Sequence, residues 1–353
     1  MSKKVSVCTQ RNWSIMAILS SRIELLTTTS EIIGYKSGLA LSREHLIQLT
    51  PPYYIDIWDG SDEGVVRIRS EEFEEIIAYI LYRTGNTYTP STMPLGMTQY
   101  HRYKENPETL RIYESVMLLF IDMLRKGLED EEKTGNKIID PTPFFKECRE
   151  RHGIIGAKMA IEILKDLEYQ QQRSPWIPYR RIEWKDTADL NNLFQSESLE
   201  TYYGSFLDQR FIDYLSQNFS DIDQINWRKF EGLTCEFFNR LGFHVEIGKG
   251  RDDDNIDARV WPTEETSNQP PTLLVQCKRQ KRKIEKVVIK ALWADITQEN
   301  AKSGLIVTTS ALSPGAQKVC TARGYPIEQA DRNALKTWIK VMRTPASGIL
   351  HGE

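Results

Sequence analysis

The chain has 353 residues, of which 40% are hydrophobic and 27% are charged, and its formal net charge is −3 at pH 7. This composition is normal for a globular protein of one large or two ordinary domains, and it argues against a general nucleic-acid coat protein. No apolar run has the length of a membrane-spanning helix, and the stretch Trp13–Leu19 is too short and too interrupted for a signal peptide. We therefore expect a cytoplasmic protein that does not contact a membrane.

The cysteines and the distribution of charge further limit the classes of protein to which the chain can belong. The five cysteines form no CxxC pair, and the five histidines are equally scattered, so neither a zinc site nor a disulfide framework is expected. Residues 225–343 contain 20 Lys and Arg against 14 Asp and Glu, whereas the rest of the chain contains 26 against 35. This asymmetry suggests a polyanion-binding part joined to a part with another task, although solvated faces also carry charge.

The first 220 residues predict a mostly helical domain for recognition, sensing or partner binding, which could be subdivided near residues 135–187. Ser70 can cap a helix that has two glutamates in its first turn. Pro107 can open another helix, whose apolar side chains fall on one face. The acidic, glycine-containing segment 126–137 is expected to be an exposed loop.

Residues 142–169 predict two helical segments broken near Gly153. They fit an ordinary helical hairpin better than a DNA-reading helix–turn–helix unit. The segment 170–187 is rich in proline, arginine and aromatic residues, and we interpret it as an ordered linker, with contact to nucleic acid as the alternative. A further helical stretch is expected from about Asp189 to Asn218.

A second domain is predicted over residues 221–345, where the apolar pattern changes. It begins with a helix that carries Phe230, Leu233 and Phe237 on one face. Strands are expected at 243–247, 256–261, 272–278 and 304–309, and later helices at 283–300, 314–323 and 333–343. The order of helix, three strands, helix, strand and helix predicts an α/β fold with a mixed central sheet, followed by a strand or loop and a last helix.

Two segments of this domain carry residues suited to phosphodiester hydrolysis. Asp257 follows a charged turn at a strand start, where it can be the central carboxylate ligand of Mg²⁺. Because side chains alternate along a strand, Gln276 and Lys278 share one face, while Cys277 points to the other and can offer its backbone carbonyl. Lys278 can orient or help deprotonate water, or stabilise charge on the phosphate. Glu231, on the preceding helix, could contact a second metal ion.

These residues carry a resemblance to a known family. Residues 248–257, 274–280 and 304–320 resemble the restriction-endonuclease-like superfamily, the PD-(D/E)xK nucleases, and within it the catalytic domain of the Mrr family. The resemblance covers about residues 225–343. The family motif maps onto Asp257, Gln276 and Lys278, its helix acid onto Glu231, and its upstream acid onto Asp253.

Two departures from the family pattern concern the metal site. Asp254 and Asn255 stand where the family usually has glycines, and both residue types tolerate a left-handed backbone. Gln276 replaces a carboxylate, as in many relatives of this branch, and is a weaker metal ligand. The sequence therefore leaves the metal affinity and the number of metal ions open.

The basic run 278–290 directly follows the predicted site. Beside a nuclease centre it is expected to contact DNA phosphates without reading bases, although a solvated helix start would look the same. The residues expected to contact DNA are Arg279, Lys281, Arg282 and Lys283.

The resemblance implies a Mg²⁺-dependent DNA endonuclease of prokaryotic restriction or anti-phage defence, in which Mn²⁺ can substitute. A defence protein is the expected partner of residues 1–220. Because cutting both strands of a duplex generally needs two active sites, a homodimer or higher homo-oligomer is expected. Two alternatives remain: a catalytically dormant nuclease fold that binds DNA or acts as a scaffold, which Gln276 favours, and a structure-selective repair nuclease.

Overall fold

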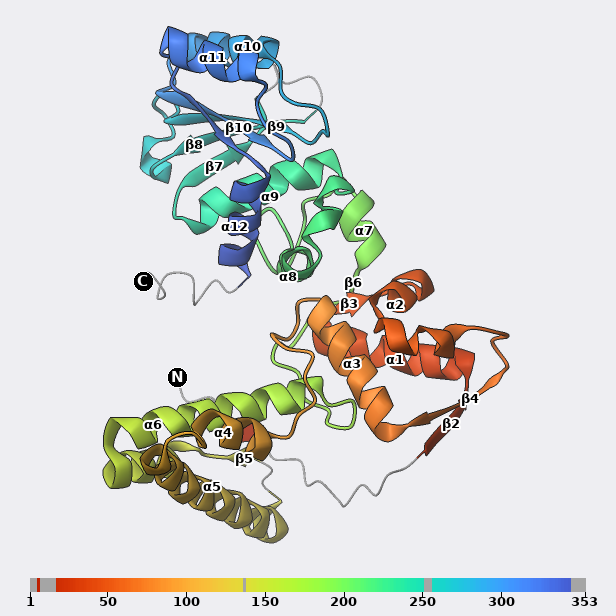
Figure 1. The fold of residues 1–353 in the computed structure, drawn as a ribbon. Coiled ribbons are helices and arrows are strands. Elements are labelled where there is room, and N and C mark those ends of the chain that lie inside the picture. The colour runs from red at the N-terminus through yellow and green to blue at the C-terminus, as the bar shows by residue number, and fades with distance from the viewer. Residues whose placement is uncertain (1–4, 7–16, 136–137, 251–255, 344–353) are drawn as a thin grey trace. The chain divides into compact units, whose positions relative to one another are not determined.

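The computed structural model describes residues 5–6, 17–135, 138–250 and 256–343. The chain packs as two compact units (Figure 1). The first unit contains residues 1–36, 43–82 and 87–183, and the second contains residues 37–42, 83–86 and 184–353. Residues 184–220 therefore pack with the later part of the chain, while a division of function near residue 220 stays a prediction. None of the helices in the described ranges combines the length and apolar character needed to span a bilayer.

The first unit consists mainly of helices, with two antiparallel strand pairs, β1 with β5 and β2 with β4. Its strands are β1 Val5–Ser6, β2 Ala17–Ser21, β4 Val65–Arg69 and β5 Ile138–Ile139. Its helices are α1 Arg22–Ser37, α2 Arg43–Leu49, the 3₁₀ helix η1 Pro52–Trp58, α3 Ser70–Arg83, α4 Leu95–Tyr103, α5 Pro107–Thr134 and α6 Thr142–Arg173. Helices α3 and α5 begin at Ser70 and Pro107, as the sequence predicts.

The loop expected from residue 126 is wrong, because α5 continues to Thr134. Gly127 does not break the helix there; a Cβ at this position would lie 2.0 Å from Ile139 Cδ1, so the missing side chain makes room for Ile139. The glutamates and lysines that follow are good helix formers. Gly135, with φ 72°, ends the helix in the left-handed conformation, and its N–H donates to Glu131 O.

Helix α6 contains the predicted break at Gly153, whose φ and ψ of 61° and −145° are accessible essentially to glycine alone. The two limbs approach closely, since a Cβ on Gly156 would lie 2.4 Å from Cys148 O. Residues from both limbs pack against α5 in one apolar cluster. These contacts are those of a helical hairpin. In the segment that follows, Arg180 lies 4.6 Å from the ring centre of Tyr35, a contact that fits the ordered-linker interpretation.

The second unit is built on a five-stranded mixed sheet of order β11–β10–β9–β8–β7. Strands β7, β8 and β9 are antiparallel, and β9, β10 and β11 are parallel. Its strands are β3 Leu39–Ala40, β6 Ala188–Asp189, β7 His244–Ile247, β8 Ala258–Trp261, β9 Leu273–Lys278, β10 Ser303–Thr308 and β11 Ile327–Ala330. The mixed sheet expected for this domain is confirmed, and the segment expected as strand or loop is the strand β11.

Helices cover both faces of this sheet, with α10 and α11 on one side and α9 and α12 on the other (Figure 1). The helical elements of the unit are α7 Leu190–Gln195, α8 Gln209–Gln217, η2 Phe219–Asp223, α9 Trp227–Arg240, η3 Glu264–Thr266, α10 Lys286–Gln298, α11 Pro314–Arg323 and α12 Arg332–Met342. Under α10 and α11 the main apolar cluster includes Leu274, Leu292 and Ile306, all fully buried. This burial fixes the faces of β9 and β10.

The single helical stretch expected from about Asp189 to Asn218 is wrong, because residues 196–208 separate α7 from α8. Two serine side chains explain the interruption. The hydroxyl of Ser196 accepts from Ser198 N–H, and the hydroxyl of Ser198 accepts from Glu200 N–H. Such local bonds compete with helical ones. Asp208 then starts α8 as its N-cap, accepting from Arg210 N–H.

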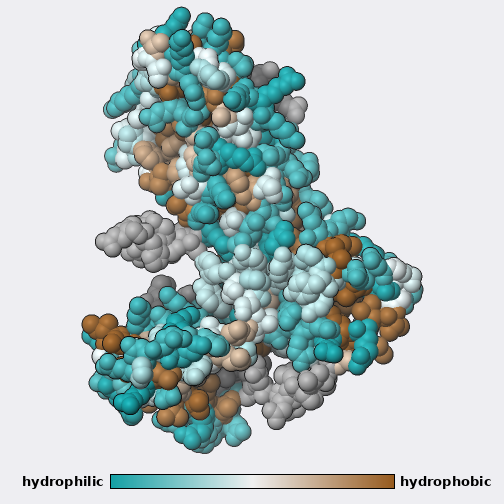
Figure 2. Space-filling model, viewed as in Figure 1, coloured by the Kyte–Doolittle hydropathy of each residue, from teal (hydrophilic) through white to brown (hydrophobic). Residues whose placement is uncertain are grey.

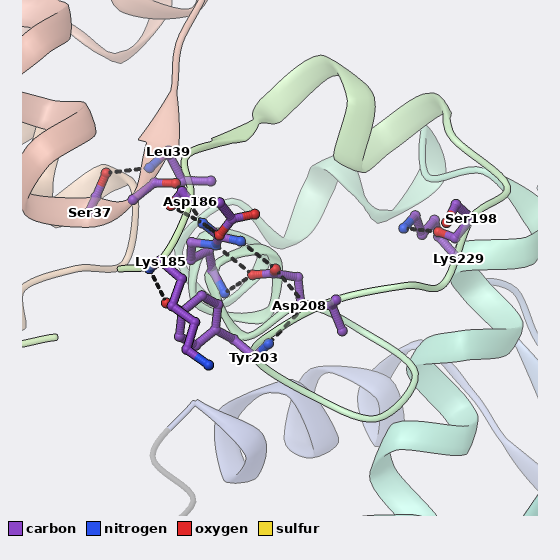
Figure 3. A network of polar contacts seen from close by, with 11 residues as sticks. Ser37, Leu39, Lys185, Asp186, Ser198, Tyr203, Asp208 and Lys229 are labelled. Carbon is purple, nitrogen blue, oxygen red and sulfur yellow. Dashed lines mark hydrogen bonds and ion pairs between the residues drawn. The ribbon is translucent and has the colours of Figure 1, made fainter. Parts of the chain in front are cut away.

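A buried polar network secures this irregular segment (Figure 3). The Arg210 guanidinium donates to both carboxylate oxygens of Asp208, at 2.8 and 2.7 Å, and to the carbonyl oxygens of Gly38 and Asp186, each at 3.0 Å. On α9, buried Lys229 donates to the Ser198 carbonyl. A cavity of about 530 Å³ has Asp208, Arg210 and Lys229 in its wall. The network joins residues near position 38 to the helices that support the sheet.

Candidate active site

The two predicted segments meet at the point where β8 begins. Asp257 directly precedes β8, and its N–H donates to Val275 O at 2.9 Å while its own carbonyl accepts from Gly248 N–H at 2.8 Å. Its carboxylate oxygen Oδ2 accepts from Cys277 N–H at 2.6 Å. The bonds to Val275 and Cys277 bracket Gln276 in the neighbouring strand β9. Backbone contacts on both sides therefore fix the Asp257 carboxylate at this end of the sheet.

Helix α9 brings Glu231 to the same place. Glu231 is 6% exposed, and its carboxyl group shares a hydrogen bond with that of Asp257. Burial, followed by the charge of Asp257, raises the pKa of Glu231 well above its usual range. Arg228, one turn earlier, donates to Glu231 Oε2 at 2.8 Å and offsets part of this effect. A buried carboxyl group, a partly buried one and a partly buried guanidinium thus lie together.

Gln276 supplies a buried oxygen atom whose hydrogen-bonding capacity is unused. The side chain is 2% exposed, and within the described part of the chain Oε1 has no hydrogen-bond partner. A buried polar atom without a partner costs free energy, so a water, an ion or a ligand is expected to satisfy it. An amide oxygen in this state is suited to accept from a ligand or to coordinate a cation.

Lys278 and Cys277 follow the predicted alternation along β9. Cys277 points toward α9, where its sulfur lies 3.5 Å from Thr234 Oγ1, and burial raises the pKa of its thiol. The thiolate is therefore disfavoured, which argues against a nucleophilic role for the Cys277 sulfur. Lys278 is half-buried on the opposite face, and its carbonyl accepts from Thr308 Oγ1 at 2.7 Å.

The residues present fit a hard divalent cation. Asp257 and Glu231 offer carboxylate oxygens and Gln276 an orphaned amide oxygen, and oxygen donors of this kind are what Mg²⁺ and Mn²⁺ prefer. The described residues contain no group of three or more His, Cys, Asp or Glu side chains arranged to hold a metal. Gln276, which stands between the two β9 residues that bond Asp257, offers a further oxygen donor on the face of β9 opposite Cys277. Asp253, predicted as a further metal ligand, lies outside the described residues.

The predicted DNA-contacting run lies at the surface just beyond this centre. Arg279, Lys281, Arg282 and Lys283 are all exposed, and the Arg279 side chain also donates to Asp223 O at 2.9 Å. The end of β10 anchors the run, since Gln280 N–H donates to Thr309 Oγ1 and Ser310 Oγ donates to Lys281 O. Lys281, Arg282 and Lys283 are thus presented from a fixed backbone.

Sequence reasoning missed Arg228 and Thr234 as parts of the site. Arg228 stands three residues before Glu231, and an Arg–Glu pair at this spacing on a helix is a signal that could have found it. Thr234, one turn after Glu231, contacts the Cys277 sulfur across the packed helix and strand. No local pattern indicates that contact, because it depends on how α9 lies on the sheet.

Comparison with protein families agrees with this geometry. Residues 222–339 match the Mrr catalytic-domain family, described as restriction endonuclease. These residues form a restriction-endonuclease-like domain. The match covers 118 of the 353 residues, so it identifies the domain of the second unit and leaves the first unit unassigned.

Comparisons with individual proteins add little to this assignment. A solved structure of the MspJI restriction endonuclease in complex with a 27-mer oligonucleotide is similar at 15% sequence identity and a TM-score of 0.29. The similarity covers 51% of this chain and 41% of that one. No curated protein matches the chain significantly.

Proposed function

We propose that this chain is a metal-dependent endonuclease that hydrolyses DNA phosphodiester bonds and serves restriction or anti-phage defence. The observation that carries the proposal is the constellation of Asp257, Glu231 and the orphaned Gln276 oxygen, with Lys278 on the same strand, inside a restriction-endonuclease-like domain. The exposed cations at 281–283 support DNA as the substrate.

In the reaction, water adds to phosphorus and one P–O ester bond breaks, which leaves a phosphate monoester and an alcohol. A divalent cation held by Asp257, Gln276 and Glu231 would neutralise charge on the phosphate and lower the pKa of water. The Cys277 N–H holds the Asp257 carboxylate in position, and the cation would take the place of the proton that this group shares with Glu231. Lys278 places a positive charge beside the phosphate, where it orients water and stabilises the developing negative charge.

Glu231 allows the two carboxyl groups to lie close together before a cation binds. Its raised pKa favours a shared proton between Glu231 and Asp257, and Arg228 compensates the remaining charge. Cation binding would displace that proton. The affinity for the cation is therefore expected to rise with pH, because the competing proton is lost.

The test uses the full-length chain and supercoiled plasmid DNA, with Mg²⁺, Mn²⁺ or EDTA. Asp257→Asn keeps an acceptor for Cys277 N–H but removes the charge, and Lys278→Ala removes the cation; each should reduce cleavage by roughly a thousandfold or more. Lys302→Ala, an exposed lysine before β10, is the matched control and should cleave like the wild type. Undiminished cleavage by Asp257→Asn and Lys278→Ala would exclude this site.

A dormant nuclease fold is the second candidate, because Gln276 stands where a carboxylate is usual. Such a protein would bind duplex DNA but would not nick it with Mg²⁺ or Mn²⁺, and Asp257→Asn would leave its DNA affinity unchanged. Parallel assays on modified duplex, single-stranded and branched DNA separate restriction from structure-selective repair.

A further inference from the structure

The outward face of α5 carries apolar side chains that no described element covers. Tyr113, Val116 and Phe120 point inward and pack in the cluster that α5 shares with α6. On the opposite face, Leu118 is 69% exposed and Ile121 is 55% exposed. In the space-filling view, brown apolar surface interrupts teal surface in the region where Figure 1 draws α5 (Figure 2).

The exposed face has the spacing of a coiled-coil seam. Seven positions follow alternating steps of three and four residues along α5: Arg111, Glu114, Leu118, Ile121, Arg125, Leu128 and Glu132. At 1.5 Å per residue this seam is about 32 Å long. Steps of three and four keep the positions on one stripe, so they can all face a single partner helix. Leu118 and Ile121 occupy the middle of the seam between charged residues, and Leu128 lies near one end between Arg125 and Glu132.

The charges of the seam are complementary to those of a second copy running in the opposite direction. If the two helices pair antiparallel about the midpoint between Leu118 and Ile121, each Leu118 lies opposite Ile121 of the other copy. It also places each Glu114 opposite Arg125 of the second copy. Each Arg111 lies opposite Leu128 of the second copy, where its side chain can reach Glu132 of that copy. Parallel pairing would instead oppose Arg with Arg and Glu with Glu, which is unfavourable. The opposed helix dipoles favour the antiparallel arrangement as well.

We propose that α5 packs antiparallel against α5 of a second copy of this chain, forming a twofold homodimer through the seam from Arg111 to Glu132. The same residues serve both partners, as twofold symmetry requires. Arg125 already pairs with Asp122 of its own helix but stays 69% exposed, so it is accessible to a second carboxylate. The inference concerns assembly and does not depend on cleavage activity.

The test measures the mass of the full-length chain by light scattering and sedimentation over about a hundredfold range of concentration. The wild type should dimerise, and Ile121→Asp should weaken dimerisation by roughly tenfold to a hundredfold, because it buries a charge at the centre of the seam. A wild type that is monomeric throughout would overturn the proposal, as would a dimer that Ile121→Asp leaves intact.

A charge swap makes the test specific for this pairing. Glu114→Arg and Arg125→Glu should each weaken the dimer, whereas the double variant should restore it. The two positions lie about 16 Å apart on one helix, so they can compensate each other only between copies. Lys126→Glu is the matched control: Lys126 also pairs with Asp122 but lies on another face, so this variant should dimerise normally. Circular dichroism checks that each variant keeps its helices. Failure of the double variant to restore the dimer would overturn the antiparallel register.

Discussion

Replacing Arg210 with Met should destabilise the second unit by about 3–5 kcal/mol. Arg210 is 2% exposed and Asp208 is 4% exposed, so the substitution would leave a buried carboxylate without its counter-ion. The carbonyl oxygens of Gly38 and Asp186 would also lose a donor each. Asp208 would still accept from Thr201 Oγ1, at 2.7 Å, and from its own helix. We therefore expect the loss to be near the middle of the range, about 4 kcal/mol.

Hydrogen exchange of peptides from α8 measures this loss without assuming that the whole chain unfolds in one step. A loss of about 4 kcal/mol corresponds to roughly thousandfold faster exchange. Asp208→Asn combined with Arg210→Met should recover part of it, because Asn still caps α8 but carries no charge. Arg259→Met is the control, since Arg259 pairs with Glu299 in a more exposed place and should cost only about 1 kcal/mol.

The pairing also predicts how the loss depends on pH. Burial raises the pKa of Asp208, but the hydrogen bonds from Arg210 and Thr201 and the charge of Arg210 together lower it below its ordinary 3.8. The stability that the pair contributes is therefore present above pH 3.8 and is lost as the pH falls through the lower folded-state pKa. The difference between the wild type and Arg210→Met should shrink in that acidic range. An effect of Arg210→Met at neutral pH no larger than that of Arg259→Met would refute the reasoning.

Three further predictions concern the site and the basic run beside it. Gln276→Leu should be neutral or stabilise the protein by about 1–2 kcal/mol in EDTA, because Oε1 has no partner among the described residues. It should also abolish the rise in melting temperature that we expect Mn²⁺ to cause in the wild type. Gln276→Glu should tighten Mn²⁺ binding by roughly tenfold in calorimetry, and equal affinity would count against a ligand role. A triple variant with alanine at positions 281, 282 and 283 should reduce the slope of log affinity for duplex DNA against log salt concentration by about 3. Alanine at Lys302, Lys318 and Lys336 is the control and should change this slope little. Equal slopes for the two triple variants would contradict the predicted phosphate contacts.

The order of helices and strands in the second unit was predictable because each element leaves a local signal. Apolar alternation marked β8, a short buried apolar run marked β9, and Pro314 marked the start of α11. Alternation also predicted that Cys277 turns away from Gln276 and Lys278. The same local reasoning failed at Gly127, which looked like a helix breaker. Its lack of a side chain serves the packing of Ile139, and that contact is not visible in the local sequence.

The sequence by itself determined which residue types stand at the ends of β8 and β9, and hence the chemistry available there. Only the tertiary structure decided that Glu231 shares a proton site with Asp257 beside Arg228, and that the Gln276 oxygen is buried without a partner among the described residues. It also decided that Arg210 binds the carbonyl of Gly38, 172 residues away. Periodicity and capping act over a few residues, whereas these pairings depend on which faces the collapsed chain brings together, and no local pattern encodes that outcome.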